Sequence, residues 1–307
     1  RQASFVALVA IVILALNRNI PYSVWRWWHR LSGPLFLIVV AHWLSIKSPI
    51  ELGNPAGLWL ASLSVLAVIA AAYKLLLYPL VARHGHYRVV NVSRGAAAAE
   101  IELEPVSHRA RFNAGQFGFL RMKAEGLREP HPFTIASAPS ADGRISFVIR
   151  ALGDYTSKLI SKVAPGMHAD VYAPYGRLER KPECRREIWI GGGVGISPFI
   201  AWMRDEEADR FEQVTLFYFF TPGRVFPDVA VLEAMAQERG IEFVPVSTGP
   251  ASDDFTRRFE ELVRSADVSS LDIAVCGPKG LLGAVRQAAH EHGLPDRVIR
   301  HELFAFR

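Results

Sequence analysis

Cysteine is scarce in this chain, since only Cys184 and Cys276 occur among its 307 residues. Two cysteines do not support the disulfide framework of a small secreted domain, so a reducing compartment is the simpler expectation. The sequence also lacks internal repeats, and its net charge of +5 comes without a basic stripe interleaved with aromatic residues. These absences argue against a repeat architecture and against nucleic acid as a partner.

Apolar residues make up 50% of the chain, and most of the excess lies before residue 83. Three apolar stretches, Gln2 to Leu16, about Val24 to Ile46 and about Ala56 to Val81, predict three membrane spans. The first is short for a spanning helix, as expected if its own start is missing here. The basic clusters around the spans place everything after Arg83 in the cytoplasm, so we expect an integral protein of the inner or plasma membrane bilayer.

The pattern of apolar and turn residues changes near residue 83 and again near residue 181. These changes predict three regions: 1–82, 83–180 and 181–307. Short apolar runs separated by turn residues indicate an antiparallel β-barrel in the middle region. In the last region strand-like and helical stretches alternate, which predicts an α/β fold with a parallel sheet and crossover helices.

The segment that organises the chain is His131-Pro132-Phe133-Thr134, between two strand-like runs of the middle region. Pro132 fixes its φ and favours extended backbone. Phe133 offers an aromatic ring, and Thr134 offers a hydroxyl and an N–H to heteroatoms such as those of a flavin. An ordinary edge strand is the alternative reading of this segment.

A glycine-rich turn follows the first strand of the last region. Its glycines allow the backbone to approach a pyrophosphate closely, and its Ser-Pro pair predicts a helix N-cap and first helical residue. The residues are Gly191, Gly192, Gly193, Gly195, Ser197 and Pro198. The spacing differs from the usual dinucleotide fingerprint, and a tight turn without a ligand is the alternative.

Two further features bear on a nucleotide. No acidic residue follows the second strand of the last region, where one usually binds a ribose hydroxyl, and Arg224 occurs instead. An arginine there favours the 2′-phosphate of NADPH, although a solvated surface charge has the same appearance. Cys276-Gly277-Pro278 ends the fourth strand, where its thiol suits a nicotinamide ring or a simple buried position before a turn.

Two histidines, His29 and His42, fall within the second apolar stretch. Ionisable groups inside a bilayer usually mark function, and thirteen helical residues span roughly 20 Å, a gap that suits two haems. Ideal helix geometry turns the two rings about 140° apart, so we expect a kink at Gly33-Pro34. The alternative is that His29 and His42 lie at the membrane interface and bind no haem. For His84 and His86 we expect the interface and no role as ligands. No other histidine occurs in residues 1–82, so second haem ligands must come from upstream helices or another chain.

In this order the motifs resemble the ferric reductase and NADPH oxidase family. The resemblance implies that His29 and His42 each ligate one of two b-type haems, and that His131 to Thr134 contact the flavin ring of FAD. It implies NADPH at the glycine turn and at Cys276 to Pro278. It adds a C-terminal aromatic tail over the flavin, with Phe306 favoured and Phe304 second. It assigns to the FAD diphosphate Arg150 and the turn Gly153-Asp154-Tyr155-Thr156, with Gly153, Tyr155 and Thr156 as the binding residues.

The resemblance implies a membrane oxidoreductase that passes electrons from NADPH through FAD and two haems to oxygen, forming superoxide, or to ferric iron. Thr134, Cys276 and Phe306 would be the residues at the reacting rings. Two other readings stay open. One is a membrane-anchored NAD(P)H:flavin reductase that serves a soluble acceptor, and the other is a non-catalytic haem-binding membrane module.

Overall fold

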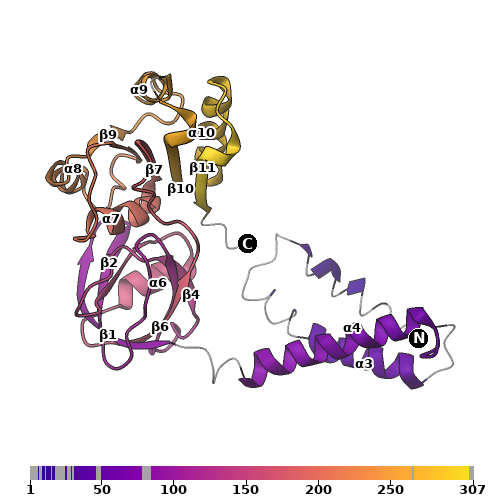
Figure 1. The fold of residues 1–307 in the computed structure, drawn as a ribbon. Coiled ribbons are helices and arrows are strands. Elements are labelled where there is room, and N and C mark those ends of the chain that lie inside the picture. Colours follow the sequence, from indigo (N-terminus) through magenta and orange to yellow (C-terminus); the bar gives the residue numbers. More distant parts are fainter. Residues whose placement is uncertain are drawn as a thin grey trace. The chain divides into compact units, whose positions relative to one another are not determined.

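The chain forms two compact units, residues 1–82 and residues 83–307, in the computed structural model (Figure 1). The structure describes residues 6, 9–10, 12–14, 16–17, 25, 29, 31–45, 50–77, 84–264 and 266–303. Phe304 and Phe306, the predicted aromatic tail, lie outside the described residues.

The first unit contains α3 (Ser32–Ser45) and α4 (Pro55–Ala72), and α4 continues into the π-helical turn η1 (Tyr73–Leu77). Only α4, with 18 residues, is long and apolar enough to cross a membrane among the described residues, and α3 is a shorter apolar helix. Large apolar side chains of α4 such as Trp59 and Leu66 are exposed. The first predicted span falls largely outside the described residues.

The second unit begins with an antiparallel sheet of six strands in the order β4-β3-β6-β1-β2-β5. An isolated bridge between Ile135 and Phe147 and a 2.8 Å hydrogen bond from Ala136 N to Ser146 O connect the end of β4 to β5. Because β4 and β5 are the two edges of the sheet, these contacts nearly close it into the predicted barrel. The strands are β1 (Gly85–Arg94), β2 (Ala98–Pro105), β3 (Phe117–Met122), β4 (His131–Thr134), β5 (Ile145–Arg150) and β6 (His168–Tyr175).

Alternating burial fills the barrel. In β1, Gly85, Tyr87 and Val89 are buried, while the residues between them are at least partly exposed. Helix α6 (Asp154–Lys162) packs on the barrel core through Leu159. The sequence did not predict a helix at this position, because its four-residue diphosphate motif was interpreted as a turn.

The rest of the unit is a five-stranded sheet in the order β11-β10-β7-β8-β9, with all neighbours parallel. Its apolar strands pack against α7 and α8 in one hydrophobic cluster and against α9 and α10 in another, which confirms the predicted α/β fold. The elements are β7 (Arg186–Gly192), η2 (Gly193–Ile196), α7 (Ser197–Met203), β8 (Val214–Phe219), α8 (Val229–Glu238), β9 (Glu242–Val246), α9 (Asp253–Arg264), η3 (Val268–Ser270), β10 (Leu271–Gly277), α10 (Lys279–Glu291), η4 (Asp296–Val298) and β11 (Ile299–Leu303).

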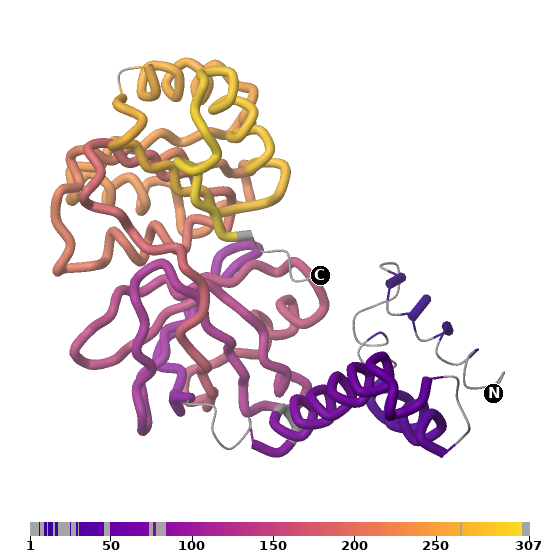
Figure 2. The backbone as a smooth tube through the Cα atoms, turned by 45° about the vertical axis from the view of Figure 1, so that its right-hand side comes forward, coloured from indigo at the N-terminus to yellow at the C-terminus, as the bar shows by residue number. Residues whose placement is uncertain are grey.

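The barrel and the parallel sheet contact each other directly, as the tube in Figure 2 shows where the magenta part meets the orange and yellow part. The indole N–H of Trp202 in α7 donates to the carbonyl of Ala114 at 2.8 Å. Both residues are buried, so this hydrogen bond forms inside the contact between the two halves. The residues at the ends of β4 and β10 are therefore held in one compact unit.

Candidate active site

The organising segment forms β4, an edge strand whose Thr134 pairs with Phe117 of β3. Thr134 is 3% exposed, and its Oγ1 has no hydrogen-bond partner among the described residues. A buried hydroxyl without a partner costs about 1–3 kcal/mol, so such a group is expected to bond to something that the chain itself does not supply. The heteroatoms of a flavin ring are suitable partners for this hydroxyl.

His131, at the start of β4, packs against helix α6. Its ring stacks on that of Tyr155, with 3.6 Å between ring centroids and 21° between planes. The phenol of Tyr155 donates to the carbonyl of Leu127 at 3.2 Å. Burial, reinforced by the charge of Glu129, raises the pKa of Tyr155 to about 12, so the phenol stays neutral. These contacts connect β4 to α6.

Helix α6 begins with Gly153 as its N-cap residue. The hydroxyl of Thr156 accepts the N–H groups of Leu152 and Gly153 at 3.0 and 3.1 Å, and so orders the backbone that enters the helix. The N–H groups of a first helical turn lack intrahelical acceptors and attract anions. The predicted diphosphate residues therefore form a helix N-terminus.

Arg150, at the end of β5, lies between α6 and the glycine turn. Its Nε is buried and has no hydrogen-bond partner in the part of the chain that the structure describes. A Cβ added to Gly193 would lie 3.7 Å from Arg150 Nη1. Arg150 therefore places a cation beside the glycine turn, and its backbone comes shortly before the start of α6 in the chain.

The glycine turn approaches the predicted nicotinamide segment closely. Gly191 of β7 is the register partner of Cys276 in β10. A Cβ on Gly195 would lie 2.1 Å from the carbonyl oxygen of Cys276, which only glycine avoids. Gly193 has φ +56°, in the left-handed region that favours glycine. The two motifs thus meet at the carboxyl edge of the sheet, where open α/β sheets bind ligands.

One detail of the glycine turn was predicted wrongly. Ser197 is the first residue of α7, Ile196 is the N-cap residue, and Pro198 is the second helical residue. The 3-10 turn η2 comes directly before α7 and already has helical dihedral angles at its end. The Ser197 hydroxyl therefore donates back to the carbonyl of Val194 at 2.7 Å.

Cys276 is fully buried, and burial together with the charge of Glu302 raises the pKa of its thiol. Glu302 lies beside Cys276 on the neighbouring strand β11, and burial raises the pKa of its carboxyl as well. A Cβ on Gly176 would lie 2.9 Å from Phe117 Cδ1 and 3.4 Å from Glu302 Oε2. Since Phe117 pairs with Thr134, the Glu302 carboxyl lies near the barrel residues of the site.

The resemblance includes Glu302 in the C-terminal segment that it identifies as the aromatic tail, but it assigns this residue no role of its own. Only the parallel pairing of β11 with β10, the strand of Cys276, brings Glu302 to the site, and the sequence does not specify that pairing. Arg224 is exposed, and its N–H closes a turn on the carbonyl of Thr221 at 3.0 Å.

The two histidines that were predicted as haem ligands, His29 and His42, lie in the first unit. His29 is exposed, and its ring stacks on Trp25 with centroids 4.7 Å apart. Helix α3 begins at Ser32, whose hydroxyl donates to the His29 carbonyl at 2.6 Å, and it contains the half-buried His42. The helix that holds His42 thus starts close to the predicted interruption at Gly33-Pro34.

Comparisons with known proteins agree with this geometry. A family model described as an FAD-binding domain matches residues 90–213. Over 222 residues the chain is 24% identical to the reductase component of propane 2-monooxygenase from Rhodococcus jostii (strain RHA1), which corresponds to 66% of this chain and 57% of that protein. Over 130 residues it is 28% identical to NADPH oxidase 1 of Mus musculus, which corresponds to 39% of this chain and 22% of that protein.

Solved structures support the fold. The ferredoxin-NADP+ reductase of Plasmodium falciparum superposes with a TM-score of 0.60 at 15% identity, covering 73% of this chain and 97% of that one. The chain spans less than two thirds of the two curated relatives described above.

The nearly closed barrel, the parallel sheet and the family match define an FAD-binding module of the ferredoxin-reductase type. Within this fold, residues 90–213 carry the match to the FAD-binding model, and the two curated relatives are a reductase component and an NADPH oxidase. The unpartnered atoms Thr134 Oγ1 and Arg150 Nε are where such a flavin would find hydrogen-bonding groups.

Proposed function

We propose that this chain is a membrane-anchored NAD(P)H:flavin reductase that delivers electrons to a separate acceptor. The observation that carries the proposal is the buried, unpartnered hydroxyl of Thr134, in the same compact unit as the contact between the glycine turn and Cys276. The apolar helix α4 would supply the anchor. The similarity to the reductase component of an oxygenase supports a soluble acceptor.

FAD, when bound, supplies the chemistry of accepting a hydride and releasing electrons one at a time. The residues of the chain bind and orient. Thr134 would hydrogen-bond the flavin ring, while Arg150 and the first turn of α6 would bind the FAD diphosphate. Gly191 to Gly195 would let the pyrophosphate of NADPH approach the backbone.

Other residues would hold the nicotinamide ring at the barrel. Cys276 is buried and the half-buried Glu302 is its neighbour on β11, which suits a ring held against the flavin. Phe304 and Phe306 would cover the flavin face until nicotinamide enters, which makes their movement a gating step. Arg224 would favour NADPH over NADH through the 2′-phosphate.

The proposal is tested on the full chain in detergent or nanodiscs, supplied with FAD. We expect a bound flavin spectrum, bleaching of the flavin absorption on rapid mixing with NADPH, and turnover with ferricyanide. Comparison with NADH reports the choice of nucleotide. Protein that takes up no FAD, or a bound flavin that stays oxidised with both nucleotides, contradicts the proposal.

A second function, electron transfer across the membrane, is favoured by the spacing of His29 and His42 in the apolar unit. Each histidine would give one imidazole to a b-type haem. The second axial ligands would have to come from upstream helices or another chain, because residues 1–82 contain no further histidine. Oxygen or ferric iron would be the final acceptor, with the flavin unit on the cytoplasmic side.

The two functions differ in what His29→Ala and His42→Ala do. A reductase with a separate acceptor keeps its ferricyanide activity in both variants and shows no haem spectrum. In the second function, the chain together with the source of the second axial ligands shows low-spin b-type haem bands, and each variant loses haem and transmembrane activity. Superoxide release and ferric-chelate reduction in proteoliposomes then separate the two acceptors.

A further inference from the structure

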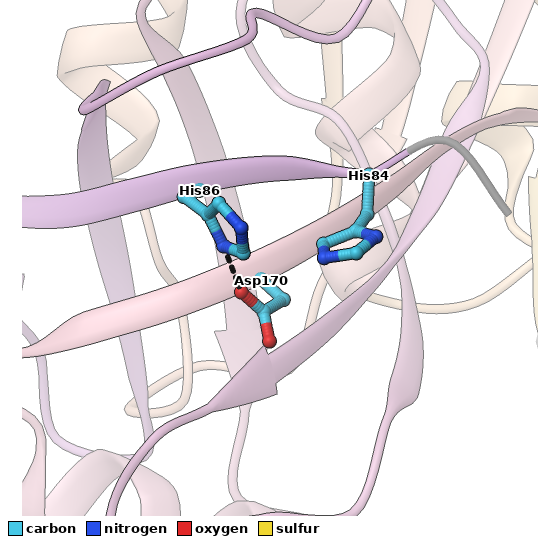
Figure 3. A group of neighbouring side chains, drawn as sticks. All are labelled: His84, His86 and Asp170. Atoms are coloured by element: carbon cyan, nitrogen blue, oxygen red, sulfur yellow. Dashed lines mark hydrogen bonds and ion pairs between the residues drawn. The ribbon is translucent and has the colours of Figure 1, made fainter. Parts of the chain in front are cut away.

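Three side chains on the outside of the barrel bring metal-binding atoms together: His84, His86 and Asp170 (Figure 3). The ring nitrogens and the carboxylate oxygen that they offer lie within 4.8 Å of one another. His84 directly precedes β1, and His86 belongs to it. Because alternate residues of a strand lie on opposite faces, the two histidines share one face, and Gly85 and Tyr87 are buried on the other. His86 and Asp170 are register partners between β1 and β6.

The packing of this cluster positions its groups. His86 Nδ1 lies 2.6 Å from Asp170 Oδ1. The ring of His84 packs on that of Tyr172 with centroids 4.9 Å apart, and meets the His86 ring edge-on at 4.8 Å. The Asp170 side chain is only 6% exposed, whereas that of His86 is 44% exposed. A nearly buried carboxylate thus faces two accessible imidazoles.

A cationic group already lies among these atoms. The ammonium of Lys123 is 2.9 Å from Asp170 Oδ1 and 3.2 Å from His86 Nδ1. The Lys123 side chain is 44% exposed, so its flexible stem can move the ammonium into water. The cluster is therefore arranged to hold one positive charge beside Asp170, and a metal ion would replace the ammonium there.

We propose that His84, His86 and Asp170 bind a divalent transition-metal ion, with Zn²⁺ as the preferred ion. Two imidazoles and one carboxylate are a ligand set that suits zinc, with a water molecule as the fourth ligand. Zinc–ligand distances near 2.1 Å place tetrahedral ligand atoms roughly 3.4 Å apart, so small side-chain movements complete the site. The bound ion would connect the beginning of β1 to β6.

A metal-free ion-pair network of Lys123, Asp170 and His86 is the competing explanation. The full chain is purified without a histidine tag, stripped with EDTA and titrated with Zn²⁺ by calorimetry and with Co²⁺ by visible absorption. We expect saturation at one ion per chain and cobalt bands in the visible. His84→Ala and Asp170→Asn should each weaken binding at least tenfold, whereas Lys123→Met should tighten it.

His290→Ala is the matched control. His290 Nε2 contacts Asp296 Oδ1 at 3.1 Å, but among the described residues no third metal-binding side chain completes a site with this pair. The His290→Ala variant should bind zinc as the wild type does. Bound FAD and thermal unfolding report whether each variant is folded. If replacing His84 or Asp170 prevents folding, Lys123→Met still tests the proposal, because a metal-free ion-pair network predicts no gain in affinity for zinc. Absence of saturable binding, or equal binding by wild type and folded His84→Ala, overturns the proposal.

Discussion

Arg204 donates to both carboxylate oxygens of Glu100, with Nη1 2.5 Å from Oε1 and Nη2 3.2 Å from Oε2. Arg204 is the C-cap residue of α7, whereas Glu100 belongs to β2 of the barrel. The same Nη1 donates to Ala136 O and Ser146 Oγ, both at 3.1 Å. One guanidinium thus joins the nucleotide-binding half to the place where the barrel closes.

Replacing Arg204 should loosen this junction. We expect Arg204→Ala to lower the free energy of unfolding by about 1–3 kcal/mol, because it leaves a partly buried carboxylate without its donor. We also expect slower reduction of FAD by NADPH, since in the proposed function the two halves hold the two reactants. Denaturant titration and stopped-flow absorption measure these effects. Arg257→Ala is the control, because Arg257 and Asp253 form an exposed pair at 3.8 Å and should change stability by less than about 0.5 kcal/mol. Equal effects of the two variants would contradict this account.

The Glu100 contact also predicts a pH dependence. Burial raises the pKa of Glu100, but the hydrogen bonds and charge of Arg204 outweigh it and hold that pKa below the ordinary value of 4.5. A carboxyl with a lowered folded-state pKa adds stability above its unfolded value, and that stability is lost as the pH falls through the folded value. The wild type should therefore exceed Glu100→Gln in stability most above pH 4.5, with a difference that shrinks below it. A difference that is constant from pH 7 to about pH 3 would exclude this linkage.

The hydroxyl of Thr134 is expected to act on the flavin and not on the fold. Thr134→Val removes the hydroxyl at nearly constant shape, and the loss of one hydrogen bond worth about 1 kcal/mol should slow flavin reduction roughly five- to tenfold. The FAD-free variant should not lose stability, because this hydroxyl has no partner in the described chain. Thr134→Ser, which keeps the hydroxyl, should react nearly as the wild type does. Rapid-mixing rates that are the same for valine and threonine would place the flavin elsewhere.

Gly195 should tolerate no side chain. A methyl group there meets the Cys276 carbonyl at 2.1 Å, so Gly195→Ala should cost about 1–3 kcal/mol of stability and impair reduction by NADPH more than reduction by dithionite. Gly283→Ala is the comparison, because a Cβ at this α10 position meets nothing within 4 Å and alanine favours a helix by up to about 1 kcal/mol. Equal melting temperatures and NADPH rates for the two variants would refute the close approach.

Local patterns were sufficient to predict the elements. Short apolar runs between turn residues predicted the barrel, and the repeated change from strand to helix after residue 181 predicted the parallel sheet. Parallel strands end at a common edge, so the glycine turn and Cys276 could be expected to meet there. The roles assigned to these residues remain predictions.

Long-range contacts could not be predicted. His84 and His86 were expected at an interface, yet they meet Asp170 because β1 pairs with β6, a register that no local pattern encodes. The contact of Arg204 with Glu100 depends on how two sheets pack. The capping role of Ser197 failed because the 3-10 turn before it already has the helical geometry that a cap residue must lack.

Helix α7 places Trp202 against Ala114, and Arg204 follows it at the barrel seam. A hybrid that joins the barrel of this chain to the parallel-sheet part of a different protein would therefore lose Trp202 and Arg204 as donors. The carbonyl groups of Ala114 and Ala136 would then lack the donors that fit them. A functional hybrid needs its crossover after this helix, or must import the barrel residues that receive it. The barrel and the parallel-sheet part look separable along the sequence, but the contacts of α7 require that both be kept together.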